Sequence, residues 1–251
     1  AYCCQAVLQP VLHVGATPVF CDIFIHTLNI NIDDVKRKVS KKTKAIIFPH
    51  MFGVSGDISS LTELGVPIIE DCATSLGAEY KGIKVGSFGD VSVFSFYATK
   101  MICTGEGGMV LTDDKGIADT IRDMRDCNGK TDFNIRYNYK MTDVEARMGI
   151  EQLKKIGSFL KRRKSIAQKY NTLINSKKAS LPMNGTYYRY IIRCNNASSL
   201  IKAMKEKGVD CEKPVPSLLH HYSKEQKYPF SEQAFKEAVS IPIYPSLTRK
   251  E

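Results

Sequence analysis

Short apolar runs alternate with amphipathic segments through the first half of the chain. The apolar runs are rich in valine and isoleucine and are bounded by glycine, proline and charged residues, which is typical of buried strands. Strands are predicted at residues 17–22, 44–49, 66–70, 91–97 and 108–112. Helices are predicted to open at residues 31–34 and to span residues 59–63 and 115–125. Because the apolar runs are continuous and helices separate them, we predict an α/β fold with a mostly parallel sheet.

A longer helical pattern begins at Thr142 and continues to about residue 174. Apolar positions recur in it at helical spacing, and Thr142 and Glu145 have the spacing of a capping box. Because the pattern is longer than an ordinary helix, we expect a kink near Gly157 and a passage between domains.

The C-terminal part predicts a second, smaller α/β unit. A strand is predicted at residues 187–193, and a helix at residues 198–208 ends at a glycine cap. We therefore predict a large domain over residues 1–160 and a small domain over residues 161–251.

Two charged residues fall just beyond the ends of predicted strands. Asp71 follows the strand at residues 66–70, and Lys100 follows the apolar run at residues 91–97. Parallel sheets collect ligands at the carboxyl ends of their strands. An apolar setting disfavours the ammonium form of a lysine, so a neutral, nucleophilic amine becomes accessible. The two residues indicate a cofactor held by a lysine at one end and a carboxylate at the other.

Several motifs occur in order over nearly the whole chain. They are GATPVFCD (residues 15–22), EDCATSLGAEYKGIKVGSFGD (70–90), SFYATK (95–100), GEGG (105–108), YNYKMTD (137–143) and IPIYPSLT (241–248). Together they closely resemble the DegT/DnrJ/EryC1/StrS family, whose members are sugar aminotransferases that use pyridoxal 5'-phosphate (PLP). The resemblance implies the aspartate aminotransferase-like fold and PLP as cofactor.

The resemblance also implies roles for particular residues. Lys100 would attach covalently to the cofactor aldehyde and move a proton between substrate and cofactor, and Asp71 would hold the pyridine nitrogen. Ser95 would bind the cofactor phosphate, and Asn138 would reach the phosphate in the neighbouring subunit, so that a homodimer shares its active sites. Thr74 is also expected among the cofactor-binding residues. It stands where the family usually has a glutamine that contacts the cofactor ring hydroxyl. A threonine hydroxyl could bond a nearer group, but it cannot span the same distance.

Four further residues are weighed for the substrate pocket. His50 and Tyr97 are expected to lie there. His50 follows the predicted strand at residues 44–49, in a segment that resembles the family's site, and Tyr97 lies in the resembling motif SFYATK that carries Lys100. His220 and His221 lie where the family approaches its sugar, but for them a structural role is favoured.

The implied reaction moves an amino group from glutamate to a nucleotide-linked keto-sugar, in amino-sugar or polysaccharide biosynthesis. A related branch of the family, the PLP-type sugar dehydratases, has histidine in place of the lysine, so Lys100 argues against that reading. A non-catalytic fragment or partner subunit of the same fold is a further alternative. In relatives, a Gly-Thr segment upstream of the region resembled here binds the cofactor phosphate, so this chain is expected to be part of a longer protein.

Charge and cysteine content indicate which kinds of partner and which cellular location to expect. The net charge is +10, and the basic clusters at residues 36–38, 41–44 and 161–164 are interpreted as solvated helix faces. They lack interleaved aromatic residues, so no nucleic-acid partner is predicted. The eight cysteines show no metal-ligand spacing, so no metal is predicted, and no apolar run is long enough to span a membrane. These features predict a cytoplasmic enzyme with reduced thiols.

Overall fold

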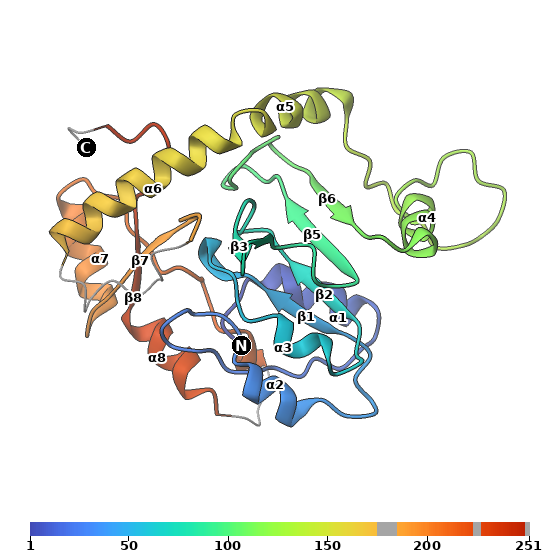
Figure 1. Cartoon of the computed structure of the whole chain (residues 1–251), viewed down its shortest axis with the longest axis horizontal. Helices are drawn as coiled ribbons and strands as arrows, with labels where there is room; N and C mark the ends of the chain where they lie inside the picture. Colours follow the sequence, from blue (N-terminus) through green and yellow to red (C-terminus); the bar gives the residue numbers. More distant parts are fainter. Residues whose placement is uncertain (175–184, 223–226, 249–251) are drawn as a thin grey trace.

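The main sheet has four strands (Figure 1). The computed structural model describes residues 1–174, 185–222 and 227–248. The strands of the sheet, in spatial order, are β1 (Ile46–Pro49), β2 (Ile68–Asp71), β5 (Val91–Ser95) and β6 (Gly108–Leu111). β1 and β5 run parallel to β2, and β6 runs antiparallel to β5. Because β2 and β5 are neighbours and parallel, their carboxyl ends lie at the same edge of the sheet.

Two short helices pack against this sheet. They are α2 (Ile32–Lys38) and α3 (Ser59–Thr62). The side chain of Asn31 accepts hydrogen bonds from the backbone N–H groups of Asp33 (3.0 Å) and Asp34 (3.3 Å), which confirms the predicted start of α2. One buried apolar cluster joins the helices to the strands: Cys21, Ile32, Val35, Ile46, Phe48, Ile58, Leu61 and Ile68.

A separate two-stranded sheet organises the C-terminal part. β7 (Tyr190–Arg193) pairs antiparallel with β8 (Ala238–Ile241). Helices α6 (Ile156–Leu173) and α7 (Ala197–Glu206) pack against these strands in a second apolar cluster. Figure 1 shows α6 running from the side of the main sheet to these strands, so this helix connects the two parts of the molecule.

The remaining helices and strands lie around these two sheets. They are α1 (Leu8–His13), β3 (Glu79–Tyr80), β4 (Ile83–Lys84), α4 (Lys115–Met124), α5 (Asp143–Leu153) and α8 (Pro229–Glu237). In Figure 1, α4 and the loop that follows it stand out from the edge of the main sheet. None of the helices in the described ranges is long and apolar enough to cross a membrane.

The two ends of the chain contribute to one core. Tyr2 and Leu28 belong to the same buried cluster as Leu218 and Ala234. The predicted division into domains over residues 1–160 and 161–251 stays a prediction, and this shared cluster shows how closely the early and late segments pack.

Asp22 holds the first turn of α8. Its carboxylate accepts hydrogen bonds from the backbone N–H groups of Phe230 (3.0 Å) and Ser231 (2.8 Å) and from the Ser231 hydroxyl (2.6 Å). An Asp22→Ala variant is expected to lower the free energy of unfolding by about 1–3 kcal/mol, because it leaves buried donors without an acceptor. Chemical denaturation measures this loss. Asp113→Ala, at an exposed carboxylate, is the matched control, and equal stability of the two variants would contradict the capping role.

Most of the predicted elements are present. The strands predicted at residues 44–49, 66–70, 91–97 and 108–112 are β1, β2, β5 and β6. The capping box at Thr142 is also confirmed, since its side chain accepts from the Glu145 N–H and the Glu145 carboxylate accepts from the Thr142 N–H.

One prediction of local structure was wrong. Residues 17–22 form no strand, because a strand needs a partner and no described segment pairs with them.

The long helical pattern from Thr142 breaks close to the predicted position. α5 ends at Leu153 and α6 begins at Ile156, so the break lies at Lys154–Lys155, just before Gly157. Gly157 itself lies in the first turn of α6.

Candidate active site at the carboxyl ends of β2 and β5

Asp71 and Lys100 lie at the same edge of the main sheet. Asp71 is the last residue of β2, and Lys100 lies in the turn that follows β5. Burial raises the pKa of the Asp71 carboxyl above its ordinary value. A hydrogen bond from the Ala73 N–H (2.9 Å) and the nearby positive charge of Lys100 offset this rise only in part. Within the described ranges, Ala73 is the only hydrogen-bond donor recorded for this carboxylate, so it can accept a further proton-bearing group.

The end of β5 carries Ser95, the turn after it carries Lys100, and hydrogen bonds hold this turn. The Ser95 hydroxyl oxygen accepts a long hydrogen bond from the Tyr97 N–H (3.4 Å), and the Tyr97 carbonyl accepts from the Lys100 N–H (2.9 Å). Tyr97 is 47% exposed, and its backbone also bridges to Gly105. The half-buried Lys100 is therefore held by a short, hydrogen-bonded turn.

Two glycines allow the neighbouring strand to approach this turn. A Cβ atom on Gly108 would lie 2.7 Å from the Phe94 carbonyl oxygen. A Cβ atom on Gly107, which has a φ of 139°, would lie 2.7 Å from Met141 and 2.8 Å from the Thr104 hydroxyl. A larger residue at position 108 would push β6 away from β5, and at position 107 it would meet Met141 and Thr104 in a backbone conformation that favours glycine.

Tyr188 contacts the Lys100 turn from the C-terminal part of the chain. The Lys100 Nζ atom lies 5.3 Å from the centre of the Tyr188 ring, and the Tyr188 hydroxyl lies 3.2 Å from the Thr99 hydroxyl. The ring is almost fully buried. An aromatic face attracts an ammonium group, so Tyr188 helps to orient the Lys100 side chain. The sequence analysis did not predict this residue as part of the site, because residues 187–193 show only the pattern of a strand.

A buried arginine holds the backbone of this tyrosine. The Nη1 atom of Arg163 donates hydrogen bonds to the carbonyl oxygens of Tyr187 (3.0 Å), Tyr188 (3.3 Å) and Ile243 (2.7 Å). Burial lowers the pKa of Arg163 to about 10. The interpretation of residues 161–164 as a solvated face is therefore wrong for Arg163, which instead ties α6 to the segment that contacts Lys100.

His50 lies behind the site, in the interior. Its side chain is fully buried, its Nε2 lies 2.9 Å from the Glu70 carboxylate, and its Nδ1 accepts from the Gly56 N–H (3.3 Å). Because Nδ1 acts as an acceptor, the proton of the neutral ring is on Nε2, which donates to Glu70. The expectation that His50 lines a substrate pocket does not fit this position, since both ring nitrogens are used and no part of the side chain reaches solvent.

Glu70 is a buried carboxylate with four donors. Its two oxygens accept from His50 and from the backbone N–H groups of Gly86, Phe88 and Gly89, each backbone contact being 2.7 Å. Burial opposes ionisation, but these hydrogen bonds outweigh it and hold the pKa of Glu70 below its ordinary value. The carboxylate fixes the loop at residues 86–89 beside the strand end that carries Asp71.

A Glu70→Gln variant is expected to destabilise the protein by about 2–6 kcal/mol. The amide NH₂ would replace an acceptor oxygen, and at least two buried donors would lose their partner, at about 1–3 kcal/mol each. Urea denaturation measures the loss. Glu79→Gln is the control, because Glu79 is half-exposed and pairs with the exposed Lys84. A loss no larger than that of the control would show that the Glu70 network does not stabilise the fold.

The Thr74 hydroxyl is hydrogen-bonded within the chain. It donates to the His50 carbonyl (2.9 Å) and accepts from the Phe52 N–H (3.1 Å). Phe52 has a φ of 59°, in the left-handed region, so these bonds hold a constrained loop. A contact from Thr74 to the cofactor stays a prediction. The Thr74 hydroxyl already donates its proton to the His50 carbonyl, so it could only accept a hydrogen bond from the cofactor.

Asn138 lies apart from the other predicted site residues. It is exposed on the loop after α4, where its backbone bridges to Asp126, and this loop stands out from the sheet in Figure 1. No contact among the described residues joins it to Lys100 of the same chain. Its predicted contact with a cofactor phosphate therefore requires a second subunit.

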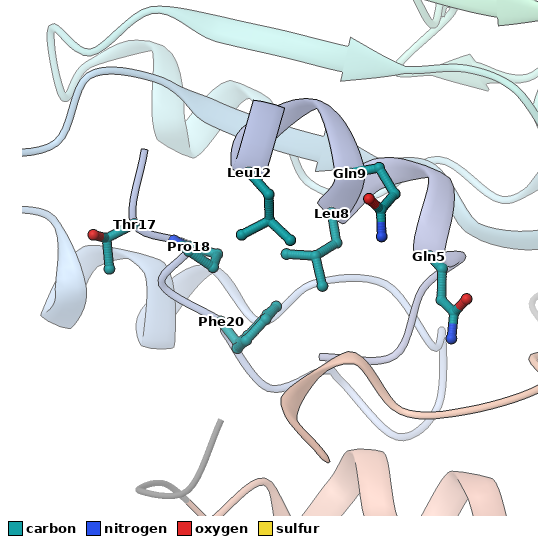
Figure 2. A pocket seen from close by; sticks show the side chains of 7 residues that line it. All are labelled: Gln5, Leu8, Gln9, Leu12, Thr17, Pro18 and Phe20. Carbon is teal, nitrogen blue, oxygen red and sulfur yellow. The ribbon is translucent and has the colours of Figure 1, made fainter. Parts of the chain in front are cut away.

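A cavity of about 380 Å³ lies elsewhere, beside α1 (Figure 2). Its lining contains Gln5, Leu8, Gln9, Leu12, Thr17, Pro18 and Phe20. Figure 2 shows Leu8, Leu12 and Phe20 facing one another across it. The lining is largely apolar and includes no ionisable side chain, so it has no acid, base or nucleophile for catalysis.

Three side chains at the sheet edge fit PLP. Asp71 has a carboxylate with a free acceptor position, Lys100 has an amine and Ser95 has a hydroxyl, and they lie at adjacent strand ends. These are the groups that would hold a pyridinium nitrogen, an aldehyde and a phosphate. The site and the fold therefore define an α/β protein of the PLP-dependent transferase class.

Comparisons with known proteins identify the family. The sequence profile of the DegT/DnrJ/EryC1/StrS aminotransferase family matches residues 2–251, and the chain belongs to this family. The GDP-perosamine synthase of Escherichia coli O157:H7 is 33% identical over 265 residues, which cover 98% of this chain and 73% of that protein. The chain thus spans about three quarters of this relative.

Solved structures confirm the predicted fold class. A DegT/DnrJ/EryC1/StrS aminotransferase from Brucella abortus has a TM-score of 0.90 and 26% identity, over 99% of this chain and 74% of the other. The putative sugar aminotransferase Spr1654 from Streptococcus pneumoniae, in a PLP form, has a TM-score of 0.89 and 26% identity, over 99% of this chain and 76% of the other. The protein is an aminotransferase of the α/β fold shared with these structures.

Proposed function

We propose that this protein is a PLP-dependent aminotransferase that moves an amino group from glutamate to a nucleotide-linked keto-sugar. The observation that carries the proposal is the placement of Asp71 and Lys100 at the carboxyl ends of neighbouring parallel strands. Family membership supports the reaction type, and the names of the relatives support a sugar acceptor bound to a nucleotide.

Asp71 and Ser95 would bind and orient the cofactor. PLP, when bound, supplies an electron sink that stabilises negative charge at the substrate carbon. The Asp71 carboxylate would accept a hydrogen bond from the protonated ring nitrogen and keep that nitrogen charged. The Ser95 hydroxyl would donate to the phosphate, since its proton is not used in the bond from Tyr97.

Lys100 would attach the cofactor and then act as the acid and base. Its amine is the one basic group that the turn after β5 brings to the edge where Asp71 ends. The Tyr188 ring limits the positions that the Nζ atom can take, so the same amine can hold and return a proton at the substrate carbon.

The charge of the chain suits an anionic substrate. A net charge of +10 raises the local concentration of a nucleotide diphosphate and of glutamate by long-range attraction.

We propose in addition that the enzyme works as a homodimer. Large apolar side chains around Asn138 are exposed, including Phe133 (106%), Ile135 (77%), Tyr139 (73%) and Val144 (71%). An exposed group of this kind is typical of an interface, and covering it would let Asn138 reach the partner's cofactor phosphate. Sedimentation velocity tests this point, and a monomer at micromolar concentration would contradict it.

A cytoplasmic location is part of the same proposal. All eight cysteines are unpaired, and Cys3, Cys21, Cys72 and Cys211 are buried. Unpaired cysteines in this number are typical of a reducing compartment.

The deciding experiment is borohydride reduction after incubation with PLP, followed by peptide mass mapping. The expected result is a pyridoxyl group on Lys100, together with a visible-edge absorbance band that glutamate bleaches before reduction. Labelling of Lys100 without bleaching by glutamate would favour a non-catalytic subunit of the same fold. Absence of the label on Lys100 would overturn its assignment.

A further inference from the structure

Two histidines and a glutamate meet between the turn at Leu219–Tyr222 and helix α8. The Nε2 atoms of His220 and His221 each lie 3.0 Å from the same carboxylate oxygen, Oε1 of Glu232. All three atoms lie within 4.8 Å of one another. Ligands of a tetrahedral zinc ion, at about 2.0–2.1 Å from the metal, are about 3.3 Å apart. The two distances from the histidine nitrogens to the Glu232 oxygen are close to that value, and the third lies within 4.8 Å, so side-chain movements would bring the three atoms around one ion.

The chemistry of the three side chains suits a borderline metal ion. Two neutral imidazoles and a carboxylate form a common zinc ligand set, in which a water occupies the fourth position. His220 is buried, whereas the side chains of His221 and Glu232 are 52% and 38% exposed. The group is therefore fixed on one side and open to solvent on the other, where an ion can enter and keep a water ligand.

The three ligands are already held in place. The His220 ring packs on Tyr228 at 4.5 Å between ring centres and meets the His221 ring at 4.8 Å in an edge-to-face contact. Glu232 lies in the first turn of α8, whose residues Phe230 and Ser231 are bound by the buried Asp22. Ligands on such rigid elements lose little freedom when an ion binds.

A second group of metal-ligating side chains provides a contrast. In the described part of the chain, His50, Glu70 and Cys72 also lie close together. There, however, each oxygen of Glu70 already accepts two hydrogen bonds, and all three residues are buried. A metal would have to displace those bonds and would have no path from solvent. At the α8 cluster, an ion would displace only the two hydrogen bonds that the ligands make with one another, and the exposed parts of His221 and Glu232 leave a path from solvent.

We propose that His220, His221 and Glu232 form a binding site for a divalent transition-metal ion of the zinc class. The ion would connect the turn at Leu219–Tyr222 to α8 and would lie outside the site formed by Asp71 and Lys100. His220 Nδ1 is buried and has no hydrogen-bond partner among the residues that the structure describes. Metal-ligating histidines usually have such a partner, and its loss weakens binding by about 10–100-fold. The site is therefore weaker than a structural zinc centre and reversible.

The test uses the full chain without an affinity tag and cobalt(II) as the optical probe. One equivalent of Co²⁺ is expected to give visible bands of a low-symmetry nitrogen and oxygen site, without the near-ultraviolet band of a cobalt thiolate, and Zn²⁺ should displace it. His221→Ala and Glu232→Gln are each expected to weaken binding at least about tenfold. Both residues are partly exposed, so the variants should keep their circular dichroism and melting behaviour.

His26→Ala is the matched control, because it removes an exposed histidine that lies outside the cluster. It should bind Co²⁺ as the unmodified chain does. Equal affinity of the control and the His221→Ala variant would overturn the proposal, and so would a thiolate band, which would assign the ion to cysteines. Failure of one equivalent to bind would also overturn it. None of these readouts involves PLP or Lys100, so the result is independent of the proposed reaction.

Discussion

A Lys100→Ala variant is expected to lose amino transfer by at least about 10²–10⁴-fold, because a positioned proton donor and acceptor contributes that much to a rate. The variant also loses the amine that attaches the cofactor, which adds to the loss. Lys100→Arg should be nearly as inactive. Arginine keeps a positive charge near the Tyr188 ring, but its guanidinium is neither nucleophilic nor able to release its proton.

Three measurements check this expectation. They are the rate at which glutamate consumes the cofactor absorbance, the full reaction with an acceptor sugar, and the mass of the pyridoxyl peptide after borohydride reduction. Lys84→Ala is the control, because Lys84 is an exposed lysine on β4 that pairs with Glu79. Activity of Lys100→Ala within tenfold of the unmodified protein would show that another residue is the acid and base.

The candidate site could be predicted in part because its strongest signals are local. An apolar run that ends in a carboxylate marks the end of β2, and a second run that ends before a lysine marks the end of β5. Parallel pairing then brings the two ends to one edge. These relations need no knowledge of the rest of the chain.

Other features depend on partners that the sequence does not reveal. Tyr188 reaches Lys100 from 88 positions later in the chain, and nothing in the aromatic pattern before β7 indicates that contact. His50 follows a strand end, as a pocket residue would, but its partner Glu70 draws it into the interior. Both outcomes are set by tertiary packing, which local pattern does not encode.

The errors in the elements have a similar cause. Residues 17–22 have the composition of a strand, but composition cannot supply a pairing partner. The basic cluster at residues 161–164 resembles a solvated helix face, but Arg163 finds three carbonyl oxygens to bind in the interior. Long polar side chains are therefore the residues whose position is least predictable from pattern.

Asp71→Asn is expected to lower amino transfer by about 10²–10³-fold, the usual effect of removing one fixed electrostatic contact to a reacting group. Asparagine can still accept the hydrogen bond from Ala73, so the backbone around it should be unchanged. It cannot keep the cofactor ring nitrogen protonated, because it carries no negative charge. The loss should appear in the rate with glutamate, while Lys100 still becomes labelled on reduction.

The same variant is expected to be more stable than the unmodified protein when PLP is absent. Burial raises the pKa of Asp71 above its ordinary value of 3.8, so the folded state binds this proton more tightly than the unfolded chain does. The Asp71 contribution to stability therefore falls as pH rises from about 4 through the folded pKa, and the penalty is complete above the folded pKa. Asparagine does not ionise and carries no such penalty. Each kcal/mol gained would raise the melting temperature by about 2–4 °C.

Thermal unfolding of the PLP-free proteins at pH 4 and pH 8 tests whether Asp71→Asn raises or lowers the stability. The stability advantage of Asp71→Asn should be larger at pH 8 than at pH 4, whereas Asp113→Asn, at an exposed carboxylate, should show no such difference. A variant that is less stable at pH 8 and yet retains activity would contradict both halves of the argument. If Asp71→Asn is more stable but inactive, the Asp71 carboxylate serves catalysis and lowers the stability of the fold.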